Sequence, residues 1–361
     1  MTGHPFNIII IGGGAAASAA ALTFLQAGET SIYIIERSDF SEQRIGETIP
    51  PDTNYFLHEL GVQNAFASQK HLPCYGSRSL WGSPRLGHND FLTSPYGNGW
   101  HLNRVMFDKM LLEQAVAKGA NRITGHCTSV ETEEDKITSV RVNGTQIMAN
   151  WYLDATGREA ILSRAGGAKR IFNDTQAVVW ARFYIKDHSL SNVTWLESVP
   201  YGWWYGAELP YGEAIIALGT DPHIAKSMGL QNIQAWAMAL SETNMIAPQI
   251  YNATIIPDSF RITASHSFLT NKIAGQNWIA IGDAASTFDP LSSAGIYKAL
   301  STGRRAAQAI IQSDKTSISS YQQYVSESYV NYTKTKAELY AGEKRWLEHP
   351  FWKKRAIIEV A

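Results

Sequence analysis

The chain has 361 residues, enough for two or three domains. Its hydrophobic fraction of 45% and its aromatic fraction of 11% are those of a protein with a packed core, which excludes a disordered chain. A net charge of −1 excludes a strongly basic surface for nucleic acid or for an anionic membrane. Cys74 and Cys127 are too few for a disulfide framework, so we expect a reducing, cytoplasmic location.

The uncharged stretch at residues 6–28 has the length of a signal peptide or a membrane span, but two features argue against both. No Lys or Arg precedes it, and three consecutive glycines that begin at Gly12 interrupt it. No later segment offers about 20 uninterrupted apolar residues. We therefore expect no stable membrane association.

Apolar periodicity and turn residues predict an alternation of strands and helices along the chain. In chain order we expect a strand at 6–11, a helix at 15–27, a strand at 31–35, a helix at 103–117, short strands within 121–152, an antiparallel sheet within 177–265, a strand at 278–281, a helix at 295–311 and helical structure from 319 onward.

A glycine pattern lies between the first predicted strand and the first predicted helix. In Gly12-x-Gly14-x-x-Ala17, the first Gly permits a tight turn and the second lets a pyrophosphate approach the backbone. The small Ala17 allows the helix to pack closely on the strand. The amides of the first helical turn, at Ala15 and Ala16, then face the phosphates with a favourable dipole. The pattern predicts a dinucleotide site.

An acidic residue supports this prediction. Glu36 ends the second predicted strand, about 20 residues after the glycines, where an acid holds the ribose hydroxyls of the nucleotide. We assign its neighbour Arg37 to the same site. An acid at this position disfavours a ribose 2′-phosphate, so the nucleotide is FAD or NAD and not NADP.

Two later segments favour FAD. Residues 154–158 (Asp-Ala-Thr-Gly-Arg) follow one predicted strand, and a Gly-Asp-Ala segment that contains Asp283 follows another. The Asp283 carboxylate can accept hydrogen bonds from sugar or ribityl hydroxyls. Pro290 then begins a rigid turn that ends at Ala294 and Gly295, where a new helix starts and its amides can stabilise negative charge.

The order of these segments resembles the class A flavoprotein monooxygenases. The resemblance implies that Asp283 contacts the ribityl chain of FAD and that the turn after it lies against the flavin ring. It places Arg104 near the pyrophosphate, although an ion pair at a helix start is the alternative. It places the backbone of Cys127 at the adenine, with the thiol serving as a small buried apolar group.

The fold class that follows is α/β (α+β). We expect a Rossmann-type FAD-binding domain interleaved with an antiparallel-sheet substrate domain, and a helical C-terminus. The predicted boundaries are 1–70, 100–170 and 267–315 for the FAD-binding domain, 71–99 and 171–266 for the substrate domain, and 316–361 for the C-terminal segment.

Within that superfamily, residues 44–50 (Arg-Ile-Gly-Glu-Thr-Ile-Pro) and a C-terminal segment that begins at Tyr340 resemble the flavin-dependent halogenase branch. The sequence departs from that branch at the residues that deliver the halogen. Gly76 stands near the position of the halogenase Lys, and Ser292 stands where the branch has a Glu. Without that Lys, chlorination lacks its relay.

The chain length, residues 44–51 (Arg-Ile-Gly-Glu-Thr-Ile-Pro-Pro) and residues 202–205 (Gly-Trp-Trp-Tyr) are more similar to the LodB/GoxB-like flavoproteins, a small group within this branch. The resemblance implies oxidation of a Trp side chain in a precursor quinoprotein oxidase, during the biogenesis of cysteine tryptophylquinone. Dioxygen and an external reductant, NAD(P)H, would be the other reactants. We expect Trp203, Trp204 and Tyr205 to line the substrate pocket, although core packing explains them equally well. Glu47 is the catalytic candidate, and a structural hydrogen bond is its alternative.

Three other functions stay open. The chain could be a flavin-dependent halogenase of a free or carrier-bound aromatic substrate. It could be a flavin reductase similar to the geranylgeranyl reductases, or a non-catalytic, flavin-bearing chaperone for the precursor oxidase. We expect no metal, because the His residues lack ligand spacing and the two cysteines lie far apart.

Overall fold

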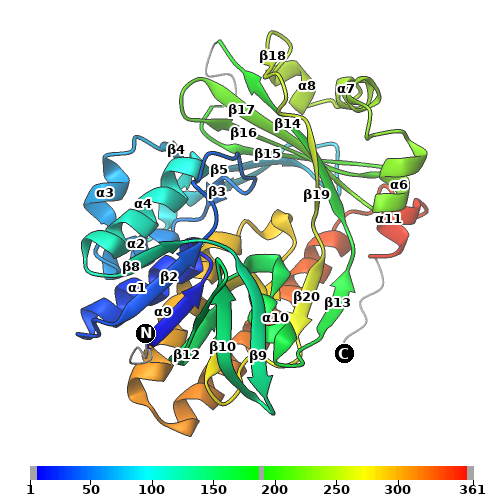
Figure 1. Cartoon of the computed structure of the whole chain (residues 1–361). Helices are drawn as coiled ribbons and strands as arrows, with labels where there is room; N and C mark the ends of the chain where they lie inside the picture. Colours follow the sequence, from blue (N-terminus) through cyan, green and yellow to red (C-terminus); the bar gives the residue numbers. More distant parts are fainter. Residues whose placement is uncertain (1–5, 187–190, 356–361) are drawn as a thin grey trace.

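A parallel sheet occupies the centre of the part of the chain that we predict to bind FAD (Figure 1). We describe residues 6–186 and 191–355 of a computed structural model. From edge to edge the parallel sheet contains β21 (Trp278–Ala280), β12 (Ala149–Asp154), β1 (Phe6–Ile11), β2 (Ile32–Glu36) and β8 (Asn121–Thr124). Both faces of this sheet are covered, so strands β1, β2 and β21 are largely apolar, whereas the edge strand β8 is polar and mostly exposed.

Helices cover one face of the parallel sheet. They are α1 (Ala15–Gln26), α4 (Arg104–Ala117), α9 (Gly295–Gln312) and α10 (Lys315–Ala341). Ile8 and Ile10 point toward these helices, whereas Ile9 and Ile11 point to the opposite face. Helices α1 and α9 approach closely because Gly303 has no side chain: a Cβ atom there would lie 2.1 Å from the carbonyl oxygen of Ala16.

An antiparallel sheet covers the other face of the parallel sheet. It consists of β9 (Cys127–Glu133), β10 (Lys136–Val142) and β11 (Thr145–Ile147). Asn143 and Gly144 connect the last two strands, and both have positive φ values of 50° and 81°. A two-residue hairpin turn of this kind needs that conformation, which Asn and Gly adopt most readily.

The second large unit is a mainly antiparallel sheet, at the top of Figure 1. Its strands are β18 (Thr254–Ile255), β14 (Ala177–Tyr184), β17 (Glu213–Thr220), β16 (Gly202–Leu209), β15 (Thr194–Val199), β5 (Gly76–Leu80) and β6 (Gly87–Asp90), with β19 (Arg261–Ala264) also paired to β14. Helices α6 (Pro222–Ser227), α7 (Ile233–Ser241) and α8 (Ile246–Gln249) belong to its outer side.

The remaining elements are short. One small sheet consists of β3 (Thr48–Ile49), β7 (Gly99–His101) and β4 (Leu72–Cys74), and another consists of β13 (Arg170–Asp174), β20 (Ser267–Thr270) and β22 (Ser286–Thr287). The short helices are α2 (Thr53–Glu59), α3 (Gln63–Ala67), α5 (Ile161–Ala165), α11 (Pro350–Lys353), η1 (Phe91–Thr93), η2 (Gly157–Glu159), η3 (Gly282–Ala284) and η4 (Pro290–Ser292).

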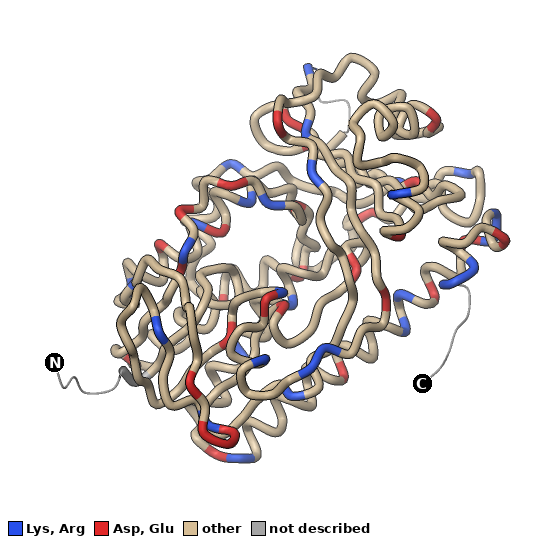
Figure 2. The backbone as a smooth tube through the Cα atoms, turned by 45° about the vertical axis from the view of Figure 1, so that its right-hand side comes forward, with Lys and Arg blue, Asp and Glu red and all other residues tan. Residues whose placement is uncertain are grey.

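The predicted fold class is confirmed: a Rossmann-type parallel sheet is combined with antiparallel sheets and a helical C-terminal part. The sequence patterns did not reveal α6–α8 within the segment that we expected to be only antiparallel strands. In the described part of the chain, no helix has the length and apolarity needed to cross a membrane. Figure 2 shows acidic and basic residues interspersed along the backbone, as the near-zero net charge predicts.

Candidate active site

A cavity of about 460 Å³ collects most of the predicted site residues. Its walls come from the carboxyl ends of the parallel strands, from the loop before β3, and from β14, β16 and β17 of the large sheet. The predicted site residues that line it are Gly12, Gly14, Ala15, Ala16, Glu36, Arg37, Glu47, Arg104, Cys127, Trp203, Tyr205, Asp283, Pro290, Ala294 and Gly295.

The glycine turn forms one end of the cavity, and its two key glycines have different roles. Gly12 has a φ of +102°, and a Cβ atom there would lie 2.2 Å from the carbonyl oxygen of Ala155. At Gly14, by contrast, a Cβ atom would meet no other atom within 4 Å. The open space beside Gly14 faces the start of α1, whose first amides have no carbonyl partner within the helix. Residue 12 therefore shapes the turn, and residue 14 leaves room for a phosphate.

Glu36 is fixed at the rim of the glycine turn. Its Oε2 accepts a hydrogen bond from the backbone N–H of Gly13 at 2.5 Å, and its Oε1 accepts one from Ser38 at 2.6 Å. A side chain at residue 13 would collide with Glu36, since a Cβ atom there would lie 2.8 Å from the Cβ of Glu36. The neighbouring Arg37 is more exposed and pairs with Glu159 at 2.7 Å.

Ala17 and Cys127 have packing roles. Ala17 belongs to the predicted cofactor-binding turn but is fully buried and does not line the cavity, so its small size serves the packing of the helix on the strand. Cys127 lines the cavity, and burial together with the nearby Asp154 raises the pKa of its thiol to about 11. A thiol with this pKa stays protonated at neutral pH and is a poor nucleophile.

Asp283 lies at the carboxyl end of β21 between two cations. Its Oδ1 accepts a hydrogen bond from the Lys298 ammonium at 2.7 Å, and Arg158 Nε lies 3.8 Å from Oδ2. Burial raises the pKa of Asp283, but Lys298 and Arg158 lower it by more, so the carboxylate is ionised. An ionised Asp283 is an acceptor for the hydroxyl groups of a ribityl chain.

The turn after Asp283 leads into α9. The Asp289 carboxylate accepts a hydrogen bond from the backbone N–H of Leu291 at 2.9 Å, which closes the turn at Pro290. Ser293 follows in the left-handed conformation, with a φ of +49°. Gly295 begins α9 beside open space, since a Cβ atom there would meet nothing within 4 Å. The start of a second helix therefore also faces the cavity.

Arg104 stabilises the loop before β3. Its Nη1 donates hydrogen bonds to the carbonyl oxygens of Ile45 at 2.9 Å and Gly46 at 3.0 Å. Its Nη2 pairs with Asp108, one turn further along α4, at 2.9 Å. The guanidinium therefore holds this loop and also lines the cavity. Its predicted contact with a pyrophosphate stays a prediction.

Glu47 is a buried carboxylate in the cavity wall. Its Oε2 accepts a hydrogen bond from the N–H of Gly46 at 2.8 Å, and its Oε1 pairs with Arg182 at 3.2 Å. Arg182 is buried too and also binds Glu213 at 3.2 Å. Burial raises the pKa of Glu47, and the charges of Arg182 and Arg104 oppose that rise without cancelling it. Glu47 is therefore a residue of the cavity wall whose carboxylate is buried and paired.

The aromatic residues on β16 alternate between its two faces, as successive residues of a strand must. Trp203 and Tyr205 line the cavity, and the Tyr205 hydroxyl makes a 2.6 Å hydrogen bond with Thr48. Trp204 points to the outer face, where it packs against Trp236 at a ring distance of 5.3 Å. Our expectation that Trp204 lines the pocket is therefore wrong.

Sequence reasoning missed Arg182, Thr48, Asp289 and Arg158 as members of this site. Arg182 could have been recognised in the sequence as a buried charge, because it is the single charged residue of the otherwise uncharged strand β14. A buried cation needs a buried anion, but the sequence does not say which of its acids that is.

The residues present fit FAD. Two helix N-termini beside open space suit a pyrophosphate and a flavin ring. Glu36 and Asp283 suit sugar and ribityl hydroxyls, and the aromatic residues Trp203 and Tyr205 also line the cavity.

Comparison with known proteins agrees with this cofactor. The model of the tryptophan halogenase family matches residues 7–75 and 83–190. LodB of Marinomonas mediterranea, which is classed as an FAD-dependent oxidoreductase, is 32% identical over 357 residues. That alignment covers 97% of this chain and 96% of LodB.

Solved structures share the fold. The flavin-dependent halogenase CmlS has a TM-score of 0.88 at 26% identity, over 99% of this chain and 68% of CmlS. QhpG, a peptidyl tryptophan dihydroxylase essential for tryptophylquinone cofactor biogenesis, has a TM-score of 0.76 at 20% identity, over 99% of this chain and 80% of QhpG. The chain therefore belongs to the LodB-like family of FAD-dependent oxidoreductases, which has the fold of the flavin-dependent halogenases.

Proposed function

We propose that this enzyme is an FAD-dependent monooxygenase that hydroxylates the indole of a Trp residue in a precursor quinoprotein oxidase. The observation that carries the proposal is the composition of the cavity. Its lining contains the glycine turn, the aromatic residues Trp203 and Tyr205, and the buried Glu47. An indole fits such a lining, because aromatic walls stack on its ring and an acceptor binds its N–H.

Two relatives support the choice of a Trp in a protein. LodB is similar over nearly the whole chain, and QhpG is a peptidyl tryptophan dihydroxylase. We infer the same class of substrate for this chain. A quinoprotein oxidase precursor is then the partner, and we place the enzyme in the cytoplasm with it.

The overall reaction balances with dioxygen and NAD(P)H. One oxygen atom enters the indole ring, the other leaves as water, and NAD(P)H supplies two electrons. Bound FAD, once reduced, supplies the activation of dioxygen. The chain supplies the binding, the orientation and the exclusion of water.

Glu47 has a defined role in this proposal. Gly46 and Arg182 hold its two carboxylate oxygens, and the residue is part of the cavity wall. We assign Glu47 the acceptance of a hydrogen bond from the substrate indole N–H, which increases the electron density of the ring. Thr48, the next residue along the chain, orients the hydroxyl of Tyr205 through a hydrogen bond, and both residues line the same cavity.

Halogenation is the second candidate, favoured by the family model and by the likeness to CmlS. Three structural observations count against it. None of the described residues that line the cavity is a lysine. Gly76 cannot be exchanged for Lys without moving β6, because a Cβ atom there would lie 2.2 Å from the carbonyl oxygen of Asn89. At the position of the halogenase Glu, the hydroxyl of Ser292 donates to the backbone carbonyl of Asp289.

Feeding experiments separate the two candidates. The purified enzyme with FAD, NADPH, a flavin reductase and a short Trp peptide should give a product that carries added oxygen and is indifferent to bromide or chloride. Product that appears only with halide would establish halogenation. Turnover without oxygen would instead favour a reductase similar to the geranylgeranyl reductases.

A further inference from the structure

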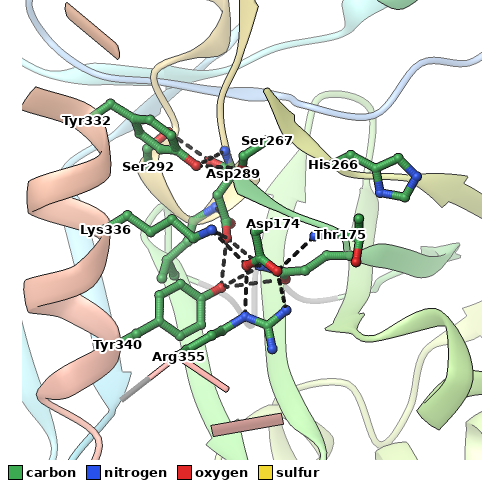
Figure 3. Close-up of polar contacts among 12 residues, drawn as sticks. Asp174, Thr175, His266, Ser267, Asp289, Ser292, Tyr332, Lys336, Tyr340 and Arg355 are labelled. Atoms are coloured by element: carbon green, nitrogen blue, oxygen red, sulfur yellow. Dashed lines mark hydrogen bonds and ion pairs between the residues drawn. The ribbon is translucent and has the colours of Figure 1, made fainter. Parts of the chain in front are cut away.

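A network of buried polar side chains lies behind the cavity wall, between the large sheet and the C-terminal part of the chain (Figure 3). Lys336 Nζ binds Asp174 at 2.7 Å, and Arg355 binds the same carboxylate at 2.8 Å. Burial raises the pKa of Asp174, but Arg355 and Lys336 hold it well below its usual range. The network is therefore charged and internally compensated, and it connects α10 and the segment after α11 to β13.

Tyr340 connects this network to the cavity. Its hydroxyl donates to Asp289 Oδ2 at 2.8 Å and accepts a hydrogen bond from Trp203 Nε1 at 3.0 Å. Gln176 also reaches both groups, donating to Asp289 at 2.6 Å and to the Tyr340 hydroxyl at 3.0 Å. Asp289 and Trp203 line the cavity from opposite units of the fold, and one hydroxyl therefore joins the two walls.

Each partner of Tyr340 fixes a different part of the site. Asp289 closes the turn before α9 through its bond to the Leu291 N–H, so a movement of its carboxylate moves that turn. The hydrogen bond from Trp203 sets the plane of an indole that faces the substrate end. Both groups are buried. Loss of the hydroxyl would remove the acceptor of the Trp203 N–H and one of the hydrogen bonds to Asp289 Oδ2, which Gln176 would still bind.

We propose that Tyr340 is a positioning residue: its hydroxyl sets the orientation of the Trp203 indole relative to the turn that faces the flavin. The inference rests on the proposed function for the nature of the substrate. In this proposal the C-terminal segment affects the reaction through Trp203 and Asp289, and it does not touch the substrate.

The Tyr340 ring also packs against Trp81, Phe351 and Trp352, with ring distances of 6.0, 6.1 and 5.8 Å. Tyr340→Phe keeps this packing and removes only the hydroxyl. Tyr321→Phe is a matched control, because Tyr321 is buried on the same helix and its hydroxyl bonds to the Ala280 carbonyl, away from Trp203 and Asp289.

The experiment measures the FAD-loaded enzyme in two ways: the visible circular dichroism of the flavin, and the dissociation constant for the peptide N-acetyl-Gly-Trp-Gly-amide. We expect Y340F to retain FAD, to change the flavin dichroism and to bind the peptide about fivefold more weakly, while Y321F changes neither reading. W203F should weaken binding similarly, and the double variant should bind no worse than the weaker single variant.

The inference is overturned if Y340F gives the same flavin dichroism and the same peptide affinity as wild type, or if the effects of W203F and Y340F add. A wild-type enzyme that holds FAD without binding the peptide would contradict the proposed function instead. The flavin dichroism of Y340F and Y321F then still decides whether Tyr340 positions the turn.

Discussion

Arg182 favours the charged form of Glu47 in a place where burial favours the neutral acid. The guanidinium lies 3.2 Å from the carboxylate, and the partial compensation leaves the pKa of Glu47 above its ordinary value. An ionised carboxylate is required to accept the substrate N–H, so the raised pKa has a kinetic consequence.

The acidic limb of the pH profile of kcat/KM should report the pKa of Glu47 in its pairing with Arg182. As pH rises through the pKa of Glu47, the carboxyl loses its proton and kcat/KM rises. In R182Q the charge that lowers this pKa is gone, so the limb should move to higher pH by about one unit or more. E213Q is the control, because it removes the other acid on Arg182 and leaves the Glu47 contact. A limb that stays in place in R182Q would show that Glu47 is not the titrating group.

Replacing Gly14 tests the cofactor site with little risk to the fold. Gly14 has a φ of −75° and open space beside it, so Gly14→Leu should fold and fill the space that a phosphate needs. We expect colourless protein with the thermal unfolding midpoint of flavin-free wild type. Gly12→Ala should instead unfold at lower temperature, because its Cβ would collide with Ala155. A yellow G14L protein would refute the site.

At the scale of elements, strand β16 divides its aromatic residues between function and core. Trp203 and Tyr205 face the cavity, while Trp204 faces α7. The period of two is fixed by the strand itself, but which phase faces the cavity depends on how the sheet packs. The sequence shows that alternate residues of the strand share a face, but it does not show which face lines the cavity. For this reason our prediction that Trp204 lines the pocket was wrong.

The pair Trp203→Leu and Trp204→Leu should separate these roles. W204L removes a fully buried ring from the outer core and should lower the free energy of unfolding by about 2 kcal/mol, with KM for the Trp substrate unchanged. W203L should raise KM severalfold, because it changes the wall that faces the substrate. Denaturant unfolding and steady-state kinetics on both variants test this. A higher KM in W204L alone would reverse the assignment.

Local sequence patterns were sufficient to predict the strands and helices around the parallel sheet. The turns at Gly12, Asp283 and Pro290 are short, and each combines a strand end with a helix start or a tight turn that the sequence shows directly. The helices α6–α8 were missed because they interrupt a segment whose apolar runs resemble strands. Contacts such as Glu47 with Arg182 join residues 135 positions apart, and no local pattern encodes that partner.

At the scale of the whole molecule, the site lies where units that are discontinuous in sequence meet. The parallel sheet supplies the glycine turn and Asp283, and the large sheet supplies Trp203, Tyr205 and Arg182. The C-terminal segment supplies Tyr340 behind the wall. The predicted domain boundaries follow this interleaving and stay predictions. We therefore propose that cofactor and substrate bind at this junction, because the lining of the cavity comes from both units.

The central claim is that the enzyme oxidises a Trp residue of a partner protein. Peptide mass spectrometry of a precursor quinoprotein oxidase, co-expressed with this enzyme or with its G14L variant, tests that claim directly. We expect one Trp-containing peptide of the precursor to gain the mass of one or two oxygen atoms with the wild-type enzyme and none with G14L. Precursor peptides of unchanged mass beside an active, yellow enzyme would contradict the account.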